Sequence, residues 1–415
     1  MNHGKMNQLN RRTFLKASGS ALGAAAGARI LGPMGVAHAA EKSVVVTVYF
    51  PGGYNAIFSS ADSFVSNGAF GVTNTNIMPV GGGIFVDKDT MGTLPKFALD
   101  HMSTVGVYHG ITSHFSVENA ILIGGQENYL VNLANAIGGN AALKAIYLGD
   151  ATSRGFPLAF PPAVNGTSLQ RITDISAAIQ AIGGAGPDPA APNVEISQAA
   201  FEAMGQMSGR QLADSPKSII SYKEGLDTGL ETLKKPVKPF SVAELRTAYG
   251  IPATSNVIGN SFPLKFATAE LMIRSGANVI NILDSRDTDV VPWDFHQTTG
   301  GRSRNGEFSR RRMTQRVIGP MRTFLDRVLN LEGYNVVVAV LGDFGRSLGG
   351  DHIPSLSVSV MGKYVKQGTT GKVAANALLD RGTTPPIKEL WSYLAAAAKV
   401  PNNPFGANKH GSLLL

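Results

Sequence analysis

Three segments of the sequence are almost continuously apolar and rich in β-branched residues. They read SVVVTVYF at 43–50, NVINIL at 278–283 and NVVVAVL at 335–341. A strand with one solvated face alternates apolar and polar residues, whereas a strand buried on both faces is apolar throughout. Strands of the second kind are typical of parallel sheets covered by helices. We therefore expect the chain to form a parallel sheet that helices enclose.

Helical segments alternate with these strands along the chain. The alternation is typical of a doubly wound α/β fold, in which a mostly parallel sheet is flanked by helices. The other elements that we expect are strands at 104–108 and 356–361, and helices at 115–136, 262–275, 308–331 and 387–398.

Two stretches lack this alternation. Residues 51–93 are rich in Gly, Asn, Ser and Thr, which predicts long loops. Residues 182–193 read IGGAGPDPAAPN, which predicts the edge of a subdomain, and 194–250 has the composition of helices. We therefore expect a helical and loop insertion around 150–255.

Composition excludes several classes of protein and of site. Hydrophobic residues make up 43% of the chain and charged residues only 16%, so charge-driven disorder is excluded. The chain has no cysteine, which excludes disulfides, thiolate zinc sites, iron–sulfur clusters and a Cys nucleophile. Any metal ion must therefore be held by His, Asp, Glu, Asn or a hydroxyl group.

The first 39 residues have the pattern of an export signal. Residues 10–16 read NRRTFLK, a weakly apolar run rich in Gly and Ala follows at 17–36, and Ala37-His38-Ala39 is a cleavage pattern. The paired arginines resemble the twin-arginine signal, although an ordinary secretory signal is the alternative. We expect a signal peptide at 1–39 read by the twin-arginine export machinery, and one periplasmic or secreted α/β domain at 40–415. We expect no membrane span, because no later run of 18 apolar residues lacks charge.

The basic charge of the chain is concentrated in this leader. Beyond residue 39 there are 32 Lys and Arg against 29 Asp and Glu. A nucleic-acid partner is therefore not expected, because it needs a concentrated basic face. A polyanion is a further candidate partner for one arginine-rich stretch, but at helical spacing its arginines do not share one face, and a solvated helix start is favoured. These arginines are Arg302, Arg304, Arg310, Arg311, Arg312 and Arg316.

Polar motifs follow several of the predicted strands. In doubly wound sheets ligands bind at the carboxyl ends of the strands, so residues just after each strand are the first functional candidates. The motifs are Gly52-Gly53-Tyr54-Asn55, Ser113-His114-Phe115, Trp293-Asp294-Phe295-His296, Asp343-Phe344-Gly345-Arg346 and Asp351-His352.

These residue types suit metal-assisted attack on an anionic ester. Asp and His bind divalent ions such as Zn²⁺ or Mn²⁺, and the ion lowers the pKa of a bound hydroxyl or water. Arg binds phosphate or sulfate through paired hydrogen bonds. Each residue also has a structural alternative: Ser113 as a helix N-cap, Asn55 in a left-handed turn, and Asp294, His296 and Asp343 as loop or turn hydrogen-bonding groups. Arg346 is alternatively an ion-pair partner of Asp343, and His352 a partly buried structural histidine. Their shared place at strand ends favours the functional interpretation.

The ordered set of motifs resembles the bacterial family DUF1501, in the alkaline phosphatase/sulfatase superfamily. The resemblance is dense over 262–400, where ATAELMIRSGANVINI precedes the Trp293 motif, with anchors at 43–58 and 104–120. It implies an alkaline phosphatase-like fold whose site holds metal ions around a Ser or Thr nucleophile. The residues that it assigns are two catalytic groups, Ser113 as nucleophile and Arg346 as anion clamp, and five metal-binding groups, Asp294, His296 and His352 at one ion and Asn55 and Asp343 at a second.

The chain departs from this pattern at three positions. It has Asn55 where the family usually has Asp, Asp343 where the family usually has Glu, and Phe344 where the superfamily usually has His. A neutral Asn is a weaker ligand than a carboxylate, so we expect one ion rather than two. Two imidazoles and a carboxylate favour Zn²⁺, with Mn²⁺ or Fe²⁺ as alternatives.

The resemblance implies an exported metal-dependent hydrolase of phosphate or sulfate esters. Its substrate would be an anionic small-molecule or polymer ester. The alternative is a catalytically inactive relative that binds a ligand or partner in the cell envelope, which the neutral Asn55 favours.

Overall fold

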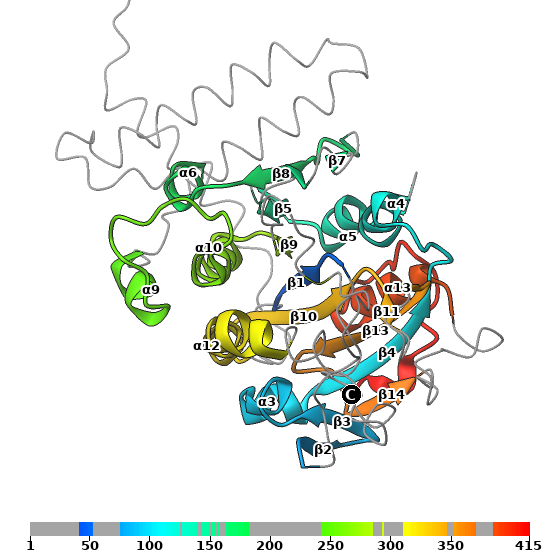
Figure 1. Cartoon of the computed structure of the whole chain (residues 1–415). Helices are drawn as coiled ribbons and strands as arrows, with labels where there is room; N and C mark the ends of the chain where they lie inside the picture. Colours follow the sequence, from blue (N-terminus) through cyan, green and yellow to red (C-terminus); the bar gives the residue numbers. More distant parts are fainter. Residues whose placement is uncertain are drawn as a thin grey trace, which may run out of the picture. The chain divides into compact units, whose positions relative to one another are not determined.

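An eight-stranded sheet forms the centre of the protein (Figure 1), with strand order β14-β4-β13-β10-β1-β9-β5-β8. The computed structural model describes residues 41–52, 75–124, 127–139, 141, 143–149, 152–153, 156–157, 163–181, 242–284, 293, 310–346, 352–370 and 385–415. Residues 41–415 form one compact unit. The strands of the sheet are β1 (Lys42–Phe50), β4 (Met102–Tyr108), β5 (Ala145–Leu148), β8 (Leu169–Ile172), β9 (Val279–Leu283), β10 (Tyr334–Gly342), β13 (Ser355–Met361) and β14 (Gly368–Thr370).

Seven of these strands run parallel, and β13 runs against them. β1 pairs in parallel with β9 and β10, β5 pairs in parallel with β8 and β9, and β14 pairs in parallel with β4. β13 is antiparallel to both of its neighbours, β10 and β4. The expectation of a mostly parallel α/β sheet flanked by helices is therefore confirmed.

Strand β1 shows why the apolar runs require two covering layers. Every residue from Val44 to Phe50 is buried. Val44, Val46 and Val48 belong to one hydrophobic cluster, whereas Val45 and Tyr49 belong to the other. Alternate residues of a strand point to opposite faces, so β1 contributes to a core on each side of the sheet.

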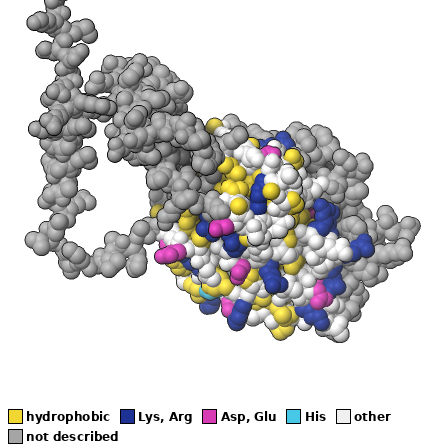
Figure 2. All heavy atoms as spheres, turned by 90° about the vertical axis from the view of Figure 1, so that its left-hand side faces the viewer, with side chains coloured by type: hydrophobic (Ala, Val, Ile, Leu, Met, Phe, Trp, Pro, Cys, Tyr) yellow, Lys and Arg dark blue, Asp and Glu magenta, His cyan; other side chains and the backbone are white. Residues whose placement is uncertain are grey.

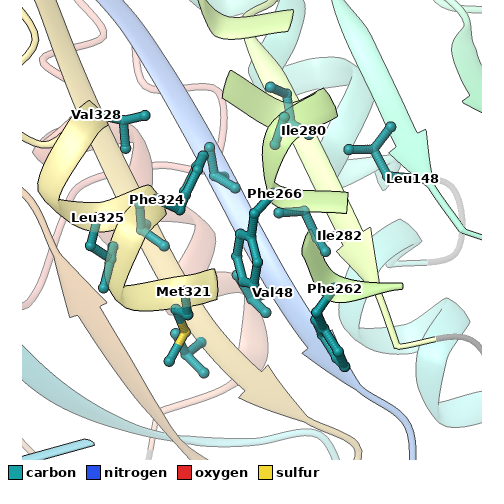
Figure 3. Packing of buried hydrophobic residues seen from close by; sticks show 14 of the residues in the cluster. Val48, Leu148, Phe262, Phe266, Ile280, Ile282, Met321, Phe324, Leu325 and Val328 are labelled. Atoms are coloured by element: carbon teal, nitrogen blue, oxygen red, sulfur yellow. The ribbon is translucent and has the colours of Figure 1, made fainter. Parts of the chain in front are cut away.

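One face of the sheet is covered by α10 (Phe262–Ser275) and α12 (Ile318–Val328). Figure 3 shows Phe266 of α10 and Phe324 of α12 packed against Val48 of β1 and Ile282 of β9. The ring centroids of the two phenylalanines are 5.1 Å apart. A single π-helical turn, η7 (Met313–Val317), precedes α12. The predicted helix at 262–275 is thereby confirmed. The predicted helix at 308–331 is helical over 310–328 and ends in a turn at 329–330.

The other face is covered by α5 (Tyr129–Ile137) and α13 (Ile387–Ala397), together with α4 (His114–Glu118) and the π-helical turn η4 (Asn119–Ile123). The rings of Tyr129 and Trp391 stack with centroids 5.4 Å apart. The indole N–H of Trp391 donates to the carbonyl oxygen of Ile121 at 2.7 Å. These contacts join α13, α5 and η4 into one layer.

Two parts of the chain for which composition predicts loops or an insertion contain regular elements among their described residues. Within 51–93, β2 (Ile77–Gly81) and β3 (Ile84–Asp87) form a hairpin, and a 3-10 turn, η3 (Met91–Thr93), leads to α3 (Lys96–Asp100). Gly82 and Gly83 have positive φ, so the glycine run is the hairpin turn itself. Within 150–255, β8 completes the sheet edge, and α6 (Ile175–Ala181) and α9 (Val242–Ala248) pack against the α10 layer.

The remaining described elements are short. β6 (Thr152–Ser153) pairs with β7 (Phe156–Pro157), β11 (Gly345–Arg346) pairs with β12 (His352–Ile353), and η8 (Gly411–Leu413) ends the chain. Among the described residues, no helix has the length and apolar character to cross a membrane.

Candidate functional site

The carboxyl ends of β1, β4, β9 and β10 lie at one edge of the sheet, because these strands are parallel. β13 runs the other way, so the residues that precede it lie at this same edge. The short strand β12, which begins at His352, comes immediately before β13 and pairs with β11, which follows β10. The antiparallel strand therefore brings His352 beside the residues that follow the parallel strands.

Asp343, the first residue after β10, is the centre of a hydrogen-bonded group. Its side chain has no exposed surface. Oδ1 accepts from the Tyr49 hydroxyl, and Oδ2 accepts from the backbone N–H of Gly52 at 2.8 Å and from Nδ1 of His114 at 2.7 Å. Gly52 has a φ of 108°, a left-handed conformation that glycine adopts without steric cost, and this turn aims its N–H at the carboxylate.

His114 and His352 lie against each other at this edge. Their ring centroids are 4.5 Å apart and their planes meet at 81°. His352 also stacks on the buried ring of Phe344, with centroids 4.3 Å apart and an interplanar angle of 9°. Nδ1 of His352 bonds the carbonyl oxygen of Thr112 at 2.8 Å, which ties the loop before α4 to β12.

His109, the first residue after β4, is a third imidazole close to Phe344, at a centroid distance of 5.8 Å. Its Nδ1 accepts from the backbone N–H of Ile111 at 3.2 Å, so the ring hydrogen is on Nε2. Nε2 is buried and, within the described part of the chain, has no hydrogen-bond partner of normal geometry. Burial lowers the pKa of His109 to about 4, and the negative charge of Asp343 partly opposes this shift.

A second buried carboxylate, Asp284, follows β9 at the same edge. Its Oδ2 accepts from the Trp293 indole N–H at 2.6 Å and from Nη2 of Arg312 at 3.1 Å. The fully buried Lys265 places its Nζ 3.9 Å from Oδ1. Asp284 thus anchors Trp293, the residue directly before Asp294.

The structure places three of the predicted site residues at this edge. Asp343 is buried, Ser113 is exposed directly before α4, and His352 is partly buried. Arg346 lies in β11 opposite His352, but its side chain is outside the described residues, as are the predicted metal ligands Asn55, Asp294 and His296. Among the residues that the structure describes, no three His, Asp or Glu side chains are grouped so that they could hold a metal ion.

Sequence reasoning missed four side chains at this edge. In the sequence Tyr49 is one residue of an apolar strand, His114 belongs to the Ser113 motif without a role of its own, and His109 stands outside every motif. Asp284 was passed over as well, although it is an acid directly after a predicted strand. His109 and Asp284 share one sequence signal with Asp343, because each is a polar residue immediately after an apolar strand. That signal identifies all three as candidates.

Three of the described arginines of the arginine-rich stretch have partners inside the protein. Arg310 pairs with Asp87, with Nε 2.7 Å from Oδ2, and Arg312 pairs with Asp284. Nη2 of Arg316 donates to the carbonyl oxygen of Asn260 at 3.3 Å. Figure 2 shows Lys and Arg dispersed among acidic and hydrophobic side chains on the face that it presents. These arginines therefore do not form one basic surface.

No model of a known protein family matches the chain, and no curated protein matches it. Among solved structures, the chain is similar to the one described as the crystal structure of Ps i-CgsB in complex with k-i-k-neocarrahexaose. The TM-score is 0.32 and the sequence identity 11%, over 90% of this chain and 74% of that chain. A likeness at this level establishes neither a shared fold nor a shared substrate.

Proposed function

We propose that the chain is an exported hydrolase of phosphate or sulfate esters that works with a divalent metal ion at the carboxyl edge of its sheet. The observation that supports the proposal most strongly is the buried Asp343 group. Asp343 accepts from Tyr49, from the N–H of Gly52 and from His114, and His114 lies against His352. A buried acid and two adjoining imidazoles beside an exposed hydroxyl supply the types of group that ester hydrolysis requires.

Imidazole is the type of donor that the described residues at this edge supply for a transition-metal ion such as zinc, without forming a complete ligand set among themselves. Imidazole nitrogen is a ligand that zinc accepts readily, and ligating histidines usually donate their other ring N–H to a carbonyl or carboxylate oxygen. His352 has this arrangement through Thr112. The resemblance adds Asp294 and His296, which lie outside the described residues, as further ligands. A bound ion would lower the pKa of a coordinated hydroxyl or water and stabilise developing negative charge.

Ser113 is the group to which we assign the attack on the ester. Its side chain is exposed, and it directly precedes His114, which is fixed by Asp343. We assign to Arg346 the binding of the non-reacting ester oxygens. The side chains of Phe344 and Ile353 are buried beneath this edge, so they exclude water from one side of the site and strengthen electrostatic interactions there.

A screen of phosphate and sulfate monoesters and diesters tests this function. We expect the full chain, loaded with Zn²⁺ or Mn²⁺, to hydrolyse at least one class, and the Ser113→Ala variant to lose that activity. Ser116→Ala is the matched control, because Ser116 is also exposed and lies on α4, the short helix that follows Ser113. Its activity should equal that of the wild type. Absence of turnover with every ester and every metal would contradict the proposal.

The alternative function is binding without catalysis, and the neutral Asn55 is the observation that favours it. In that case the protein would bind an anionic ligand or a cell-envelope partner and would hydrolyse no ester. Asn55→Asp distinguishes the two functions. A carboxylate should raise metal stoichiometry or ester turnover in an enzyme with a weak second metal position, because ligand charge governs affinity for hard cations. In a binding protein it should leave turnover absent.

A further inference from the structure

We propose that His109 is a positioning residue for Ser113, because its imidazole ring fixes the turn that begins the β4–α4 segment, residues 109–113. This inference rests on the proposed function, in which the exposed Ser113 attacks the ester, and it names the side chain that sets where Ser113 stands. His109 itself would touch neither the ester nor a metal ion.

Backbone contacts hold both ends of the β4–α4 segment against the chain between β12 and β13. The backbone N–H groups of His109 and Gly110 both donate to the carbonyl oxygen of Pro354, at 3.0 and 3.1 Å. Further along, Nδ1 of His352 bonds the carbonyl oxygen of Thr112 at 2.8 Å. The start and the end of the segment are therefore fixed to the same neighbouring part of the chain.

The middle of the segment depends on the His109 side chain. The backbone N–H of Ile111 donates to Nδ1 of His109 at 3.2 Å. Gly110 between them has a φ of 78°, a left-handed conformation that glycine adopts without steric cost and that lets the chain turn back towards the ring. Asn and Asp fix tight turns in the same way, by accepting from the N–H two residues further on. His109 uses a ring nitrogen for this purpose.

The ring that provides this acceptor is held in place by its neighbours. Its centroid lies 5.8 Å from that of Phe344, whose side chain is fully buried. Burial lowers the pKa of His109, and the charge and the backbone of Asp343 both oppose this shift, so Asp343 adjoins the ring as well. In a close-packed interior a ring has few alternative positions, because each would leave a cavity or cause a clash. His109 is therefore a fixed point beside Asp343 on which the turn is built.

The state of the two ring nitrogens excludes a direct catalytic role for His109. A backbone N–H only donates, so the Nδ1 that accepts from Ile111 carries the lone pair and the hydrogen is on Nε2. Nδ1 is thereby occupied, and Nε2 is buried. Neither nitrogen is open to an ester that approaches from solvent. A contribution of His109 to the reaction must then pass through the segment that it holds.

The position of Ser113 depends on this turn, because Ser113 lies two residues beyond Ile111 and its side chain is exposed. An exposed side chain on a connecting segment takes its position from the backbone beneath it. Without the ring acceptor, the N–H of Ile111 would lose its hydrogen bond and the turn would gain alternative conformations. A misplacement of ~1 Å in a reacting group can cost ~100-fold in rate. Loss of the acceptor should therefore lower turnover while the fold stays intact.

Two variants separate the acceptor from the bulk of the ring. His109→Phe keeps a ring against Phe344 and removes the acceptor. His109→Asn removes most of the ring but keeps a side-chain oxygen that can accept from the N–H of Ile111. His101→Phe is the matched control, because Nδ1 of His101 bonds the carbonyl oxygen of Val365 at 3.1 Å, outside the β4–α4 segment.

The first measurement is hydrogen exchange of the full chain, read by mass spectrometry in peptides that span the β4–α4 segment. We expect His109→Phe to raise the exchange rate of the Ile111 amide by ~10-fold, the effect of losing one hydrogen bond. His109→Asn should stay close to the wild type, and His101→Phe should match it. No substrate is needed, so exchange decides whether His109 fixes the turn even if no ester is hydrolysed.

The second measurement is the kinetics of the ester that the wild type hydrolyses, with the folding of each variant checked by its urea midpoint. His109→Phe should lower kcat by ~10–100-fold and leave KM nearly unchanged, because the ester contacts stay while the attacking group is misplaced. His109→Asn should restore kcat to near the wild-type value. If the ring served packing alone, the order would be reversed, because Asn leaves the larger cavity.

Three results would overturn the inference. Wild-type exchange at Ile111 in His109→Phe would show that the ring does not fix the turn. Faster exchange with an unchanged kcat would show that the turn does not position Ser113. A kcat in His109→Asn as low as in His109→Phe would show that the acceptor is not the group that matters. The hydrolase proposal fails separately: if the wild type hydrolyses no ester while exchange follows the expected order, the role of His109 in the turn is supported and the reaction assigned to Ser113 is refuted.

Discussion

Replacing Tyr49 with Phe is expected to destabilise the folded protein by about 1.5–3 kcal/mol, the range for a hydrogen bond to a charged group. The substitution removes only the hydroxyl that donates to Asp343, and the ring stays buried in the cluster beneath α5 and α13. Cavity formation therefore adds little. The cost should lie in the upper part of the range, because the carboxylate has no exposed surface and water cannot replace the lost donor without rearrangement.

Urea denaturation followed by tryptophan fluorescence measures this difference, because both tryptophans, Trp293 and Trp391, are fully buried and report on opposite faces of the sheet. Tyr334→Phe is the matched control. Its hydroxyl donates to a neutral backbone carbonyl, that of Arg274, at 3.3 Å, so its removal should cost no more than ~0.5–1.5 kcal/mol. If Tyr49→Phe costs less than the control, Asp343 does not depend on the hydroxyl and the account of this group is wrong.

Three further predictions concern other parts of the chain. Glu270→Ala should cost about 3–5 kcal/mol in the same assay, because the buried Glu270 accepts from Arg327 at 2.7 and 2.8 Å and its loss leaves that guanidinium without its carboxylate. Burial holds the folded-state pKa of His109 near 4, below its unfolded value of about 6.5. The free energy of unfolding should therefore fall by on the order of 3 kcal/mol as the pH drops from 6.5 to 4. In a His109→Gln variant, urea midpoints measured over the same pH range should fall less than those of the wild type. Lys in place of both Arg11 and Arg12 should leave the precursor uncleaved in the cytoplasm, and normal processing on an immunoblot would indicate the ordinary secretory route.

The long strands of the fold could be predicted because burial on both faces leaves a continuous apolar run. The runs at 43–50, 278–283 and 335–341 correspond to β1, β9 and β10 within one residue at each end. β5 and β8 were missed because each has only four residues, too few to show a period. β8 in addition carries exposed Gln170 and Arg171, as suits a strand at the sheet edge.

The candidate site was predictable only in part, because its contacts join residues that are far apart in the chain. Asp343 could be singled out by its place after a strand, but its bond to His114 spans 229 positions and its bond to Tyr49 spans 294. The place of His352 depends on the antiparallel direction of β13. The described residues between β10 and β13 form the β11–β12 pair and no crossover helix, as suits antiparallel neighbours.

The alternation of side chains along the strands explains why the two buried carboxylates serve different groups. In β10, Val337, Ala339 and Leu341 belong to the cluster beneath α5 and α13, and Asp343 continues this alternation to the face that holds Tyr49. In β9, the side chains of Ile280 and Ile282 belong to the cluster beneath α10 and α12. Asp284 is the next residue in this every-second-residue series, so its carboxylate lies on the same face, with Lys265 and Arg312.

The parallel register, in which Phe50 pairs with Gly342, then sets the next residues of β1 and β10 side by side, so that the N–H of Gly52 reaches Asp343. A slip of one residue would turn Asp343 towards the opposite cluster and separate it from its three donors. The register that buries the valines of β1 and β10 is therefore also the register that assembles the Asp343 group. Substitutions that loosen this strand pair should therefore disturb the Asp343 group even when they lie far from it.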